Sequence, residues 1–237
     1  MIKLSIIIPV YNEARTISEL LGRVRDLPLV HGISREIIIV NDCSTDNSDE
    51  LITAFIQQHP DDELLYIKQE VNQGKGAALH RGIQAAGSDY IVIQDADLEL
   101  NPSDINLLLE AQVSGKSQVI YGSRFIGNTH ENTKYVWHIL GNGFLTKFSN
   151  LFSGLKLTDM MTCYKLVPTP LIQSLKLKEK RFGFEPEITL KLSKIKGLTI
   201  TEVPISYTAR SKSDGKKINW KDGMKVIWCI LRYRIGN

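Results

Sequence analysis

Two aspartates one residue apart, Asp95 and Asp97, follow the largely apolar run from Tyr90 to Gln94. Carboxylates at a strand end can hold a divalent cation with one side chain, while the other bonds a ribose hydroxyl or a metal-bound water. Ala96 between them is small enough for a ligand to come close. Such pairs also occur by chance and in helix caps, so it is the position directly after a predicted strand that favours a binding site.

A second polar segment, Gln73-Gly74-Lys75-Gly76, opens a predicted helix. Backbone N–H groups at a helix start and the Lys75 ammonium can face a phosphate, although a plain helix-entry turn explains the same residues. The sequence contains no P-loop pattern, no GxGxxG, no HExxH and no GxSxG. A P-loop nucleotide site and a serine hydrolase triad are therefore unsupported.

Strand and helix patterns alternate through the first half of the chain. The expected strands are residues 3–10, 36–40, 64–68 and 90–94, and the expected helices are residues 16–27, 49–58 and 76–86. Runs such as Ile6-Ile7-Ile8 do not alternate with polar residues, which is typical of strands buried on both faces. We therefore predict an α/β fold with a mainly parallel, doubly wound sheet flanked by helices.

This fold predicts where the polar loops meet. In an open parallel sheet, ligands bind beyond the carboxyl ends of the strands. Three polar clusters of this sequence follow predicted strands, namely Tyr11-Asn12-Glu13, Asn41-Asp42 and Asp95-Ala96-Asp97. We expect them to form one acidic crevice.

The net charge of +3 hides a division between the two halves of the chain. Residues 1–120 contain 9 Lys and Arg against 18 Asp and Glu, a net of −9, and residues 121–237 contain 20 against 8, a net of +12. An acidic half can hold divalent cations and a basic half can hold phosphate or an anionic membrane. The division suggests an anionic substrate met from both sides, although charge that only keeps the protein solvated is the alternative.

Length and composition favour one globular domain over residues 1–237, with 43% hydrophobic and 23% charged residues. The apolar run at residues 226–231 is far shorter than the ~20 residues of a membrane-spanning helix. The N-terminus lacks an export-signal pattern, and three cysteines without CxxC spacing favour a reducing compartment. We expect a cytoplasmic protein without a nucleic-acid partner.

The second half predicts amphipathic helices at residues 135–155 and 221–233 and a strand at residues 198–207. Residues 136–157 carry Trp and Phe, and residues 210–237 contain 8 Lys and Arg against 2 Asp and Glu. This composition suits peripheral attachment to an anionic lipid surface. Packing of both helices in the core or at a dimer interface is the alternative.

Five ordered blocks of sequence resemble family 2 glycosyltransferases of the GT-A (nucleotide-diphospho-sugar transferase) fold, and most closely the dolichyl- or polyprenyl-phosphate sugar synthases. The blocks are Ser5 to Glu13, Val40 to Asp46, Asn72 to Ala78, Gln94 to Glu99, and Gly122 to Phe125 (GSRF). The match continues in order through Gly183 to Glu187 and Val203 to Tyr207. It implies a nucleotide-sugar-binding half at residues 1–120 and an acceptor-binding half at residues 121–237.

The resemblance implies a set of residues that bind the nucleotide-sugar. Pro9, Tyr11 and Glu13 would hold its base and ribose, and Asp42 would hold the edge of the base. The set is Pro9, Tyr11, Glu13, Asp42, Lys75, Asp95, Ala96 and Asp97. Their carboxylates and carbonyls accept hydrogen bonds from N–H and O–H groups. Asp95 and Asp97 would also hold a Mg2+ or Mn2+ ion that bridges the diphosphate and neutralises charge as the sugar departs.

The implied acceptor is a lipid phosphate, which is anionic at neutral pH because its second pKa is ~6, so no strong general base is needed. Fixed cations must draw it toward the donor diphosphate, and Arg124, Arg210 and Lys216 are the candidates. The expected catalytic residues are Asp97, Arg124 and Arg210. The segment 210–217 resembles a loop that closes over both substrates, or is a plain basic surface loop.

One departure concerns the acceptor site. Family members often carry a second arginine after GSRF, where this chain has His138, Lys147 and neutral amides. Glu185 and Glu187 bond the sugar or orient the acceptor in one interpretation, and simply begin a helix in the other. Asp159 falls where relatives line the sugar pocket.

We therefore expect an inverting, metal-dependent glycosyltransferase that moves a hexose from a GDP- or UDP-linked sugar to a polyprenyl phosphate at the cytoplasmic face of a membrane. A membrane-protein partner is a further expectation. The nearest alternative uses a sugar hydroxyl as acceptor and needs a carboxylate base, such as Asp159, Glu185 or Glu187. A nucleotidyltransferase and a non-catalytic binding module are the remaining alternatives.

Overall fold

The computed structural model describes residues 2–127, 136–209 and 220–236. Four strands form a parallel group in which β1 (Lys3–Val10) lies between β2 (Ser34–Asn41) and β4 (Tyr90–Ile93), and β3 (Leu64–Lys68) pairs with β2. Because the strands are parallel, all four end at the same edge of the sheet. The parallel α/β arrangement predicted for the first half is confirmed.

The rest of the sheet is mixed. β6 (Lys165–Pro168) runs antiparallel between β4 and β5 (Val119–Ser123), and β7 (Ile200–Pro204) lies parallel to β5. The order β3-β2-β1-β4-β6-β5-β7 joins strands from both halves of the chain in one seven-stranded sheet. β7 falls within the predicted strand at 198–207, whereas β6 escaped prediction because four residues are too few to show a pattern.

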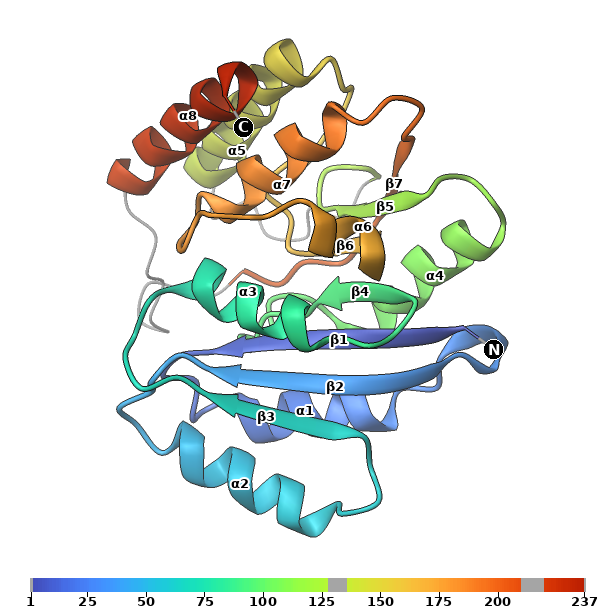
Figure 1. Cartoon of the computed structure of the whole chain (residues 1–237), viewed down its shortest axis with the longest axis vertical. Coiled ribbons are helices and arrows are strands. Elements are labelled where there is room, and N and C mark those ends of the chain that lie inside the picture. Colours follow the sequence, from blue (N-terminus) through green and yellow to red (C-terminus); the bar gives the residue numbers. More distant parts are fainter. Residues whose placement is uncertain (1, 128–135, 210–219, 237) are drawn as a thin grey trace.

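Helices cover both faces of this sheet (Figure 1). One face carries α1 (Ile17–Asp26), α2 (Ser48–Gln58) and α4 (Ile105–Val113). The other carries α3 (Lys75–Ala85), α5 (Val136–Ser153), α6 (Thr169–Ser174), α7 (Phe184–Ser193) and α8 (Trp220–Ile235). Short 3-10 turns at Val30–Gly32 and Pro102–Asp104 precede β2 and α4.

The isoleucine run of β1 supplies both cores, because successive side chains of a strand point to opposite faces. Ile6 and Ile8 belong to the core beneath α1 and α2, and Ile7 belongs to the core beneath α3 and α7. A Cβ at Gly82 would lie 2.5 Å from Cγ2 of Ile7, so glycine is what lets α3 approach β1 this closely. The close approach sets the position of the first turn of α3 at the sheet edge.

The helices α5, α7 and α8 gather at one end of the molecule (Figure 1). The inner side of α8 is buried through Val226, Ile230 and Tyr233, whereas Met224 and Trp228 are exposed. The predicted amphipathic helices are confirmed as α5 and α8, and core packing accounts for one side of α8 only. In the part of the chain that the structure describes, no helix combines the length and apolar character needed to cross a bilayer.

Candidate functional site

A cavity of about 430 Å³ opens beyond the carboxyl ends of β1, β2 and β4, and residues near β6 and α7 line its other side. The described candidates for the nucleotide-sugar, the metal and the acceptor phosphate all line it: Pro9, Tyr11, Glu13, Asp42, Lys75, Asp95, Ala96, Asp97 and Arg124. Of the three candidate bases, Glu185 lines the cavity, whereas Asp159 and Glu187 do not. Arg210 and Lys216 lie outside the described residues, so their roles stay predictions. Cavities of a few hundred Å³ are typical of small-molecule sites.

Three residues other than glycine adopt left-handed backbone conformations just beyond these strand ends. They are Asn12 (φ 55°), Cys43 (φ 58°) and Leu98 (φ 57°). Such conformations cost about 1 kcal/mol or more and cluster at binding sites. Asn12 is fixed by its partners, since its Oδ1 accepts from the N–H of Thr45 at 2.7 Å and its N–H donates to Ser44 Oγ at 3.1 Å. The loops after β1 and β2 are thereby tied together at the cavity rim.

Asp42 organises the loop that leads into α3. Its buried carboxylate accepts from the backbone N–H groups of Gln73 (2.8 Å) and Gly74 (2.7 Å) and from the side chain of Gln69. Gly74 has a φ of 99°, and a Cβ there would lie 2.7 Å from the carbonyl oxygen of Lys180. Asp42 therefore positions the turn before Lys75, and its contact with a nucleotide base stays a prediction.

Lys75 joins several elements at the cavity. Its Nζ lies 2.7 Å from Oδ1 and 2.9 Å from Oδ2 of Asp95, which follows β4. It lies 2.9 Å from Sγ of Cys163, which precedes β6, and the Cys163 thiol also donates to Asp95. Oε1 of Glu185, on α7, is 3.9 Å away. Lys75 thus balances carboxylates brought together from both halves of the chain.

These contacts decide the protonation states. Burial would raise the pKa of Asp95, but Lys75 and the Cys163 thiol outweigh it and hold that pKa below its ordinary value. Burial would lower the pKa of Lys75, but Asp95, Cys163 and Glu185 raise it well above its ordinary value. Burial and the Asp95 charge raise the pKa of Cys163. Asp95 is therefore ionised and its two oxygens are shared with an ammonium.

One carboxylate oxygen of Glu185 accepts a hydrogen bond, whereas the other accepts none from the described residues. Its Oε2 accepts from Nζ of Lys165, which is itself fully buried and lies 4.9 Å from the centre of the Tyr121 ring. Its Oε1 is buried and has no hydrogen-bond partner among the described residues, although Glu185 lines the cavity. A buried carboxylate oxygen without a donor is costly, so this atom is placed to accept from a ligand.

Glu187 is different, because its carboxylate accepts from the N–H groups of Lys178 and Glu179 and from Nζ of Lys191. It is completely buried and does not line the cavity. The two glutamates that open α7 therefore separate into one that faces the cavity and one that fixes the preceding segment.

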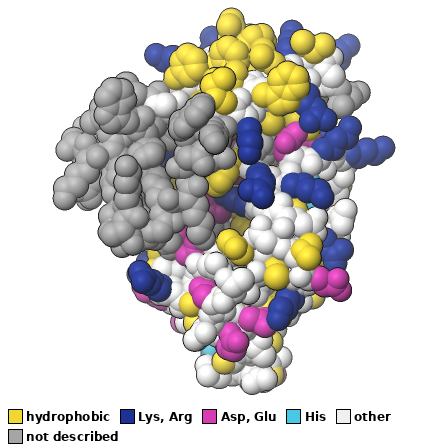
Figure 2. Space-filling model, turned by 90° about the vertical axis from the view of Figure 1, so that its left-hand side faces the viewer, with side chains coloured by type: hydrophobic (Ala, Val, Ile, Leu, Met, Phe, Trp, Pro, Cys, Tyr) yellow, Lys and Arg dark blue, Asp and Glu magenta, His cyan; other side chains and the backbone are white. Residues whose placement is uncertain are grey.

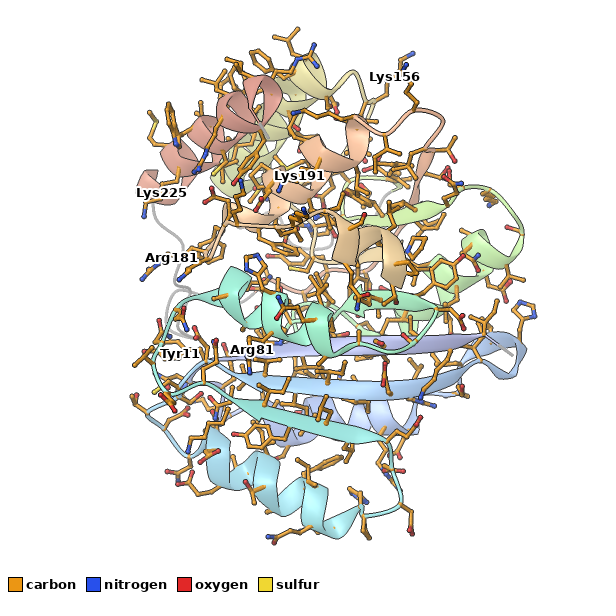
Figure 3. All side chains as sticks on the ribbon, viewed as in Figure 1. Tyr11, Arg81, Lys156, Arg181, Lys191 and Lys225 are labelled. Carbon is orange, nitrogen blue, oxygen red and sulfur yellow. The ribbon has the colours of Figure 1, made fainter. Side chains whose placement is uncertain are left out.

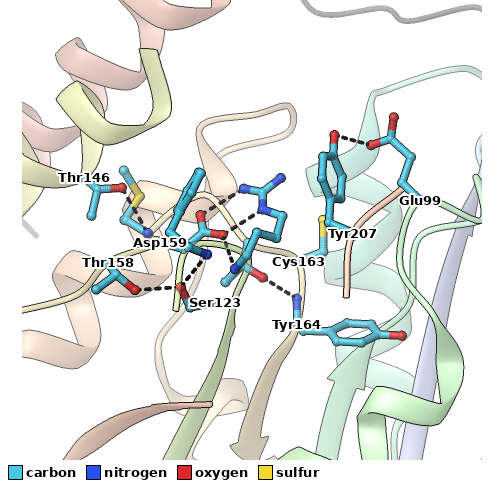
Figure 4. A network of polar contacts seen from close by, with 12 residues as sticks. Glu99, Ser123, Thr146, Thr158, Asp159, Cys163, Tyr164 and Tyr207 are labelled. Atoms are coloured by element: carbon cyan, nitrogen blue, oxygen red, sulfur yellow. Dashed lines mark hydrogen bonds and ion pairs between the residues drawn. The ribbon is translucent and has the colours of Figure 1, made fainter. Parts of the chain in front are cut away.

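Arg124 forms an ion pair through two nitrogens with Asp159, which Figure 4 labels within a network of polar contacts. Its Nε lies 2.7 Å from Oδ2 and its Nη2 lies 2.9 Å from Oδ1 of Asp159, while the guanidinium carbon lies 5.2 Å from the centre of the Tyr207 ring. Burial would lower the pKa of Arg124, but Asp159 outweighs it and raises the pKa. Arg124 therefore places a permanent positive charge in the cavity wall. Two of its nitrogens already donate hydrogen bonds to Asp159.

Asp97 and Glu99 belong to one loop at the cavity. The N–H of Glu99 donates to Oδ1 of Asp97 at 3.1 Å, and the Tyr207 hydroxyl donates to Oε2 of Glu99 at 3.1 Å. Both carboxylates line the cavity and supply the oxygen ligands that Mg2+ and Mn2+ prefer. Among the described residues, no three His, Cys, Asp or Glu side chains surround a common metal position.

Several residues that line the cavity had no assigned site role in the sequence interpretation. They are Glu99, Cys163, Arg181, Phe182 and Tyr207. Glu99 was within reach of prediction, because it follows Asp97 by two residues in the same loop. Cys163 and Arg181 come to the cavity only through the placement of β6 and α7, which no local pattern encodes.

Comparison with known proteins matches residues 5–174 to the family model described as glycosyl transferase family 2. The chain is 27% identical over 216 residues to the dolichol-phosphate mannosyltransferase of Pyrococcus furiosus, which covers 90% of this chain and 59% of that protein. It is 28% identical over 260 residues to the dolichyl-phosphate beta-glucosyltransferase of Dictyostelium discoideum, which covers 98% of this chain and 74% of that protein. The chain thus spans less than two thirds of the archaeal relative.

Among solved structures, glucosyl-3-phosphoglycerate synthase from Mycobacterium tuberculosis in complex with Mn2+, UDP and phosphoglyceric acid superposes with a TM-score of 0.73. The identity is 19%, and the match covers 100% of this chain and 80% of that chain. A structure of the same enzyme with Mg2+ and UDP gives a TM-score of 0.68 at 18% identity, covering 100% of this chain and 80% of that chain. The likeness establishes the fold, and the GT-A fold expected from the sequence is confirmed.

Replacing Lys75 with methionine tests the charge balance of the cavity. Because Asp95 has a lowered pKa in the folded protein, its stabilising contribution is present above about pH 4 and is lost as the pH falls through that pKa. Without Lys75, burial disfavours the charged carboxylate, so we expect Lys75→Met to lower the free energy of unfolding by about 3 kcal/mol at pH 7. Once Lys75 is gone, burial raises the pKa of Asp95, so the variant can protonate this carboxylate as the pH falls, and the loss should shrink as the pH approaches 4.

Urea unfolding of wild type and Lys75→Met at pH 7 and pH 4.5 measures this difference. Lys68→Met is the control, because Lys68 is 55% exposed in its ion pair with Asp49 and its loss should change stability much less. A loss of equal size at both pH values would contradict the proposed charge balance.

Proposed function

Since the chain belongs to glycosyl transferase family 2, we propose that it transfers a hexose from a nucleotide-sugar to a polyprenyl phosphate. The names of the archaeal and Dictyostelium relatives support a dolichyl-type phosphate as acceptor. In this reaction an acceptor phosphate oxygen bonds the anomeric carbon of the donor sugar from the face opposite the departing nucleoside diphosphate. The bond from that carbon to the β-phosphate oxygen breaks, and a nucleoside diphosphate leaves.

One observation carries this proposal: the polar loops after three parallel strands meet in a single cavity. The donor-binding candidates from residues 9 to 97 all line it, and Arg124 contributes a cation from the opposite half. Ligand binding beyond the carboxyl ends of strands is the rule for open parallel sheets. The charge-balanced aspartate, the strained loops and the cavity volume all suit a nucleotide-sugar.

A divalent cation fits the loop of Asp97 and Glu99. These two carboxylates supply hard oxygen ligands, and the diphosphate and water would supply the others, since the described residues hold no three-ligand cluster. Such an ion, when bound, neutralises charge on the departing diphosphate. The Mn2+ and Mg2+ complexes of the M. tuberculosis enzyme support this choice of metals. Asp95 remains a predicted ligand that would share its oxygens with Lys75.

We assign the donor sugar to the part of the cavity beside Glu185. Its Oε1 accepts no hydrogen bond from the residues that the structure describes, and sugar hydroxyls are the donors that a nucleotide-sugar brings. Lys165 holds the other oxygen and so fixes the orientation of the carboxylate. Glu185 is therefore proposed to bind one hydroxyl of the hexose.

A phosphate acceptor also suits the carboxylates of this site. The three that were considered as a general base are each paired with a cation, Asp159 with Arg124, Glu185 with Lys165 and Glu187 with Lys191. A sugar hydroxyl would need one of them to take its proton, whereas a phosphate is already an anion. The ion pairs favour the phosphate.

We further propose that the end of the molecule formed by α5 and α8 binds an anionic lipid surface. Large apolar side chains are exposed there, and Figure 2 shows them as a cap bordered by Lys and Arg. The exposed apolar residues are Phe144, Leu151, Met224, Trp228 and Ile235. An apolar face with a basic border is typical of helices that lie at a membrane interface, and this face would bring the enzyme to its lipid substrate.

A panel of GDP- and UDP-linked sugars, incubated with farnesyl phosphate and Mg2+ or Mn2+, tests the proposed reaction. We expect one donor to give a prenyl-phosphate sugar and an equal amount of nucleoside diphosphate, with loss of product when the metal is chelated. Farnesol is the control acceptor and should give no product, because it lacks the anionic nucleophile. Transfer to a sugar hydroxyl but never to farnesyl phosphate would contradict the proposal.

Glu185→Gln tests the sugar assignment. The change keeps the size of the side chain but replaces a charged acceptor with a neutral one, so we expect the affinity for the nucleotide-sugar to fall about tenfold. The affinity for the nucleoside diphosphate alone should not change. Isothermal titration calorimetry measures both ligands.

A donor that lacks the hydroxyl bound by Glu185 provides the control. Among monodeoxy sugar donors, one should bind wild type and Glu185→Gln equally. An equal loss of affinity for the nucleoside diphosphate and the nucleotide-sugar would show instead that the substitution disturbs the whole cavity.

A further inference from the structure

We call the cavity of about 430 Å³ beyond β1, β2 and β4 the catalytic cavity. A second cavity, of about 470 Å³, adjoins it at the start of α7. Its described lining contains five cationic side chains and one acidic one, Glu179; the cations are Lys178, Lys180, Arg181, Lys225 and Arg232. Arg181 and Phe182 line both cavities, so the two cavities meet at these residues. We call this second cavity the basic groove.

The two cavities have opposite charge. The described lining of the catalytic cavity contains six carboxylates, Glu13, Asp42, Asp95, Asp97, Glu99 and Glu185, against three cations, Lys75, Arg124 and Arg181. In the basic groove, Glu179 is itself paired with Arg232 at 3.2 Å. A phosphate monoester with a charge of about −1.5 to −2 is therefore attracted to the groove and repelled by the carboxylates beyond Arg181.

The segment that carries Lys180 and Arg181 is fixed in place. The buried Glu187 carboxylate accepts from the N–H groups of Lys178 (2.8 Å) and Glu179 (2.7 Å). The carbonyl oxygen of Lys180 accepts from the N–H of Ala77, on α3, at 3.0 Å. Backbone anchors at both ends leave the basic side chains to extend from a rigid base, which lowers the entropy cost of binding an anion.

The groove also borders an apolar surface. Trp228 lines the groove and is 62% exposed, and Met224, one turn earlier on α8, is 57% exposed. Figure 2 shows a band of Lys and Arg side chains between the apolar cap and the acidic part of the molecule, and Figure 3 shows Arg181 and Lys225 extending on the same side. An amphiphile with an anionic head and an apolar chain matches this order of surfaces.

We propose that the basic groove binds the phosphate group of the polyprenyl phosphate acceptor, with Lys180 and Arg181 as the main ligands and Trp228 against the first prenyl units. This inference rests on the proposed function. It departs from the expectation from the sequence, which assigned this phosphate to Arg124 and to Arg210 and Lys216, two residues outside the described part of the chain. Arg124 is only partly exposed and donates hydrogen bonds from two of its nitrogens to Asp159, whereas Arg181 is exposed and lines both the groove and the catalytic cavity.

The proposal commits to the substrate phosphate rather than the head group of a bilayer lipid. The reason is the position of Arg181, which lines the catalytic cavity as well as the groove, so an anion that it binds lies next to the proposed donor site. A bilayer head group has no need of such a connection.

The test compares two double variants that remove equal charge. Lys180→Ala with Arg181→Ala removes two cations of the groove, and Lys116→Ala with Lys196→Ala removes two exposed cations that line neither cavity. Binding of farnesyl phosphate and of farnesol to the full chain is measured by calorimetry without donor. Steady-state kinetics with farnesyl phosphate as acceptor are measured in the absence of vesicles.

We expect the groove variant to weaken farnesyl phosphate binding and raise its KM at least tenfold, with the KM of the donor changed less than twofold. Farnesol should bind weakly to all variants, and the control variant should behave as wild type. Salt should weaken acceptor binding to wild type more than to the groove variant.

Three results would overturn the proposal. The first is an unchanged affinity of the groove variant for farnesyl phosphate. The second is an equal loss for donor and acceptor, which would assign Arg181 to the donor. The third is loss of binding to phosphatidylglycerol vesicles with unchanged binding of farnesyl phosphate, which would assign the groove to a bilayer lipid. If wild type binds farnesyl phosphate through the groove but transfers no sugar to it, the groove stands and the proposed reaction fails.

Discussion

The ion pair between Lys75 and Asp95 is the interaction on which the arrangement of the site depends. A parallel sheet brings its polar loops to one edge, and in this chain those loops carry carboxylates that repel one another. Lys75 lies 2.7 Å from Asp95 and also contacts Cys163, so one ammonium joins the end of β4 to α3 and to the segment before β6. Asp42 in turn positions the loop that delivers Lys75. This cation therefore offsets part of the negative charge of the cavity.

The two cavities differ in charge and therefore suit different ligands. The catalytic cavity keeps an excess of carboxylates, which suits a donor whose diphosphate binds together with a divalent cation. The basic groove has the opposite charge and suits the second anion. In the proposed reaction each substrate would be attracted to its own cavity, and Arg181 lines both cavities. The exposed apolar face of α5 and α8 lies on the side from which a lipid substrate would arrive.

The parallel half of the fold was predictable because its signals are local. The buried isoleucine runs and the helical periodicity between them predict β1 to β4 with small errors at the strand ends. Because ligands bind beyond the carboxyl ends of parallel strands, the polar residues there could also be expected to line one cavity. β6 and α6 were not predictable, since each is too short for periodicity to show. The pairing of Arg124 with Asp159, 35 residues apart, and the hydrogen-bond deficit of Glu185 depend on tertiary packing. No sequence pattern encodes which carboxylate at the start of α7 faces the cavity.

Binding of Mn2+, followed by electron paramagnetic resonance with and without a nucleoside diphosphate, tests the central claim most directly. Two carboxylates from one loop, Asp97 and Glu99, make a weak site alone, so the account predicts that UDP or GDP tightens Mn2+ binding at least tenfold. Asp97→Asn should abolish this gain while the protein remains folded. Nucleoside diphosphate that binds equally well in the presence of a chelator, or Mn2+ that binds independently of the nucleotide, would contradict it.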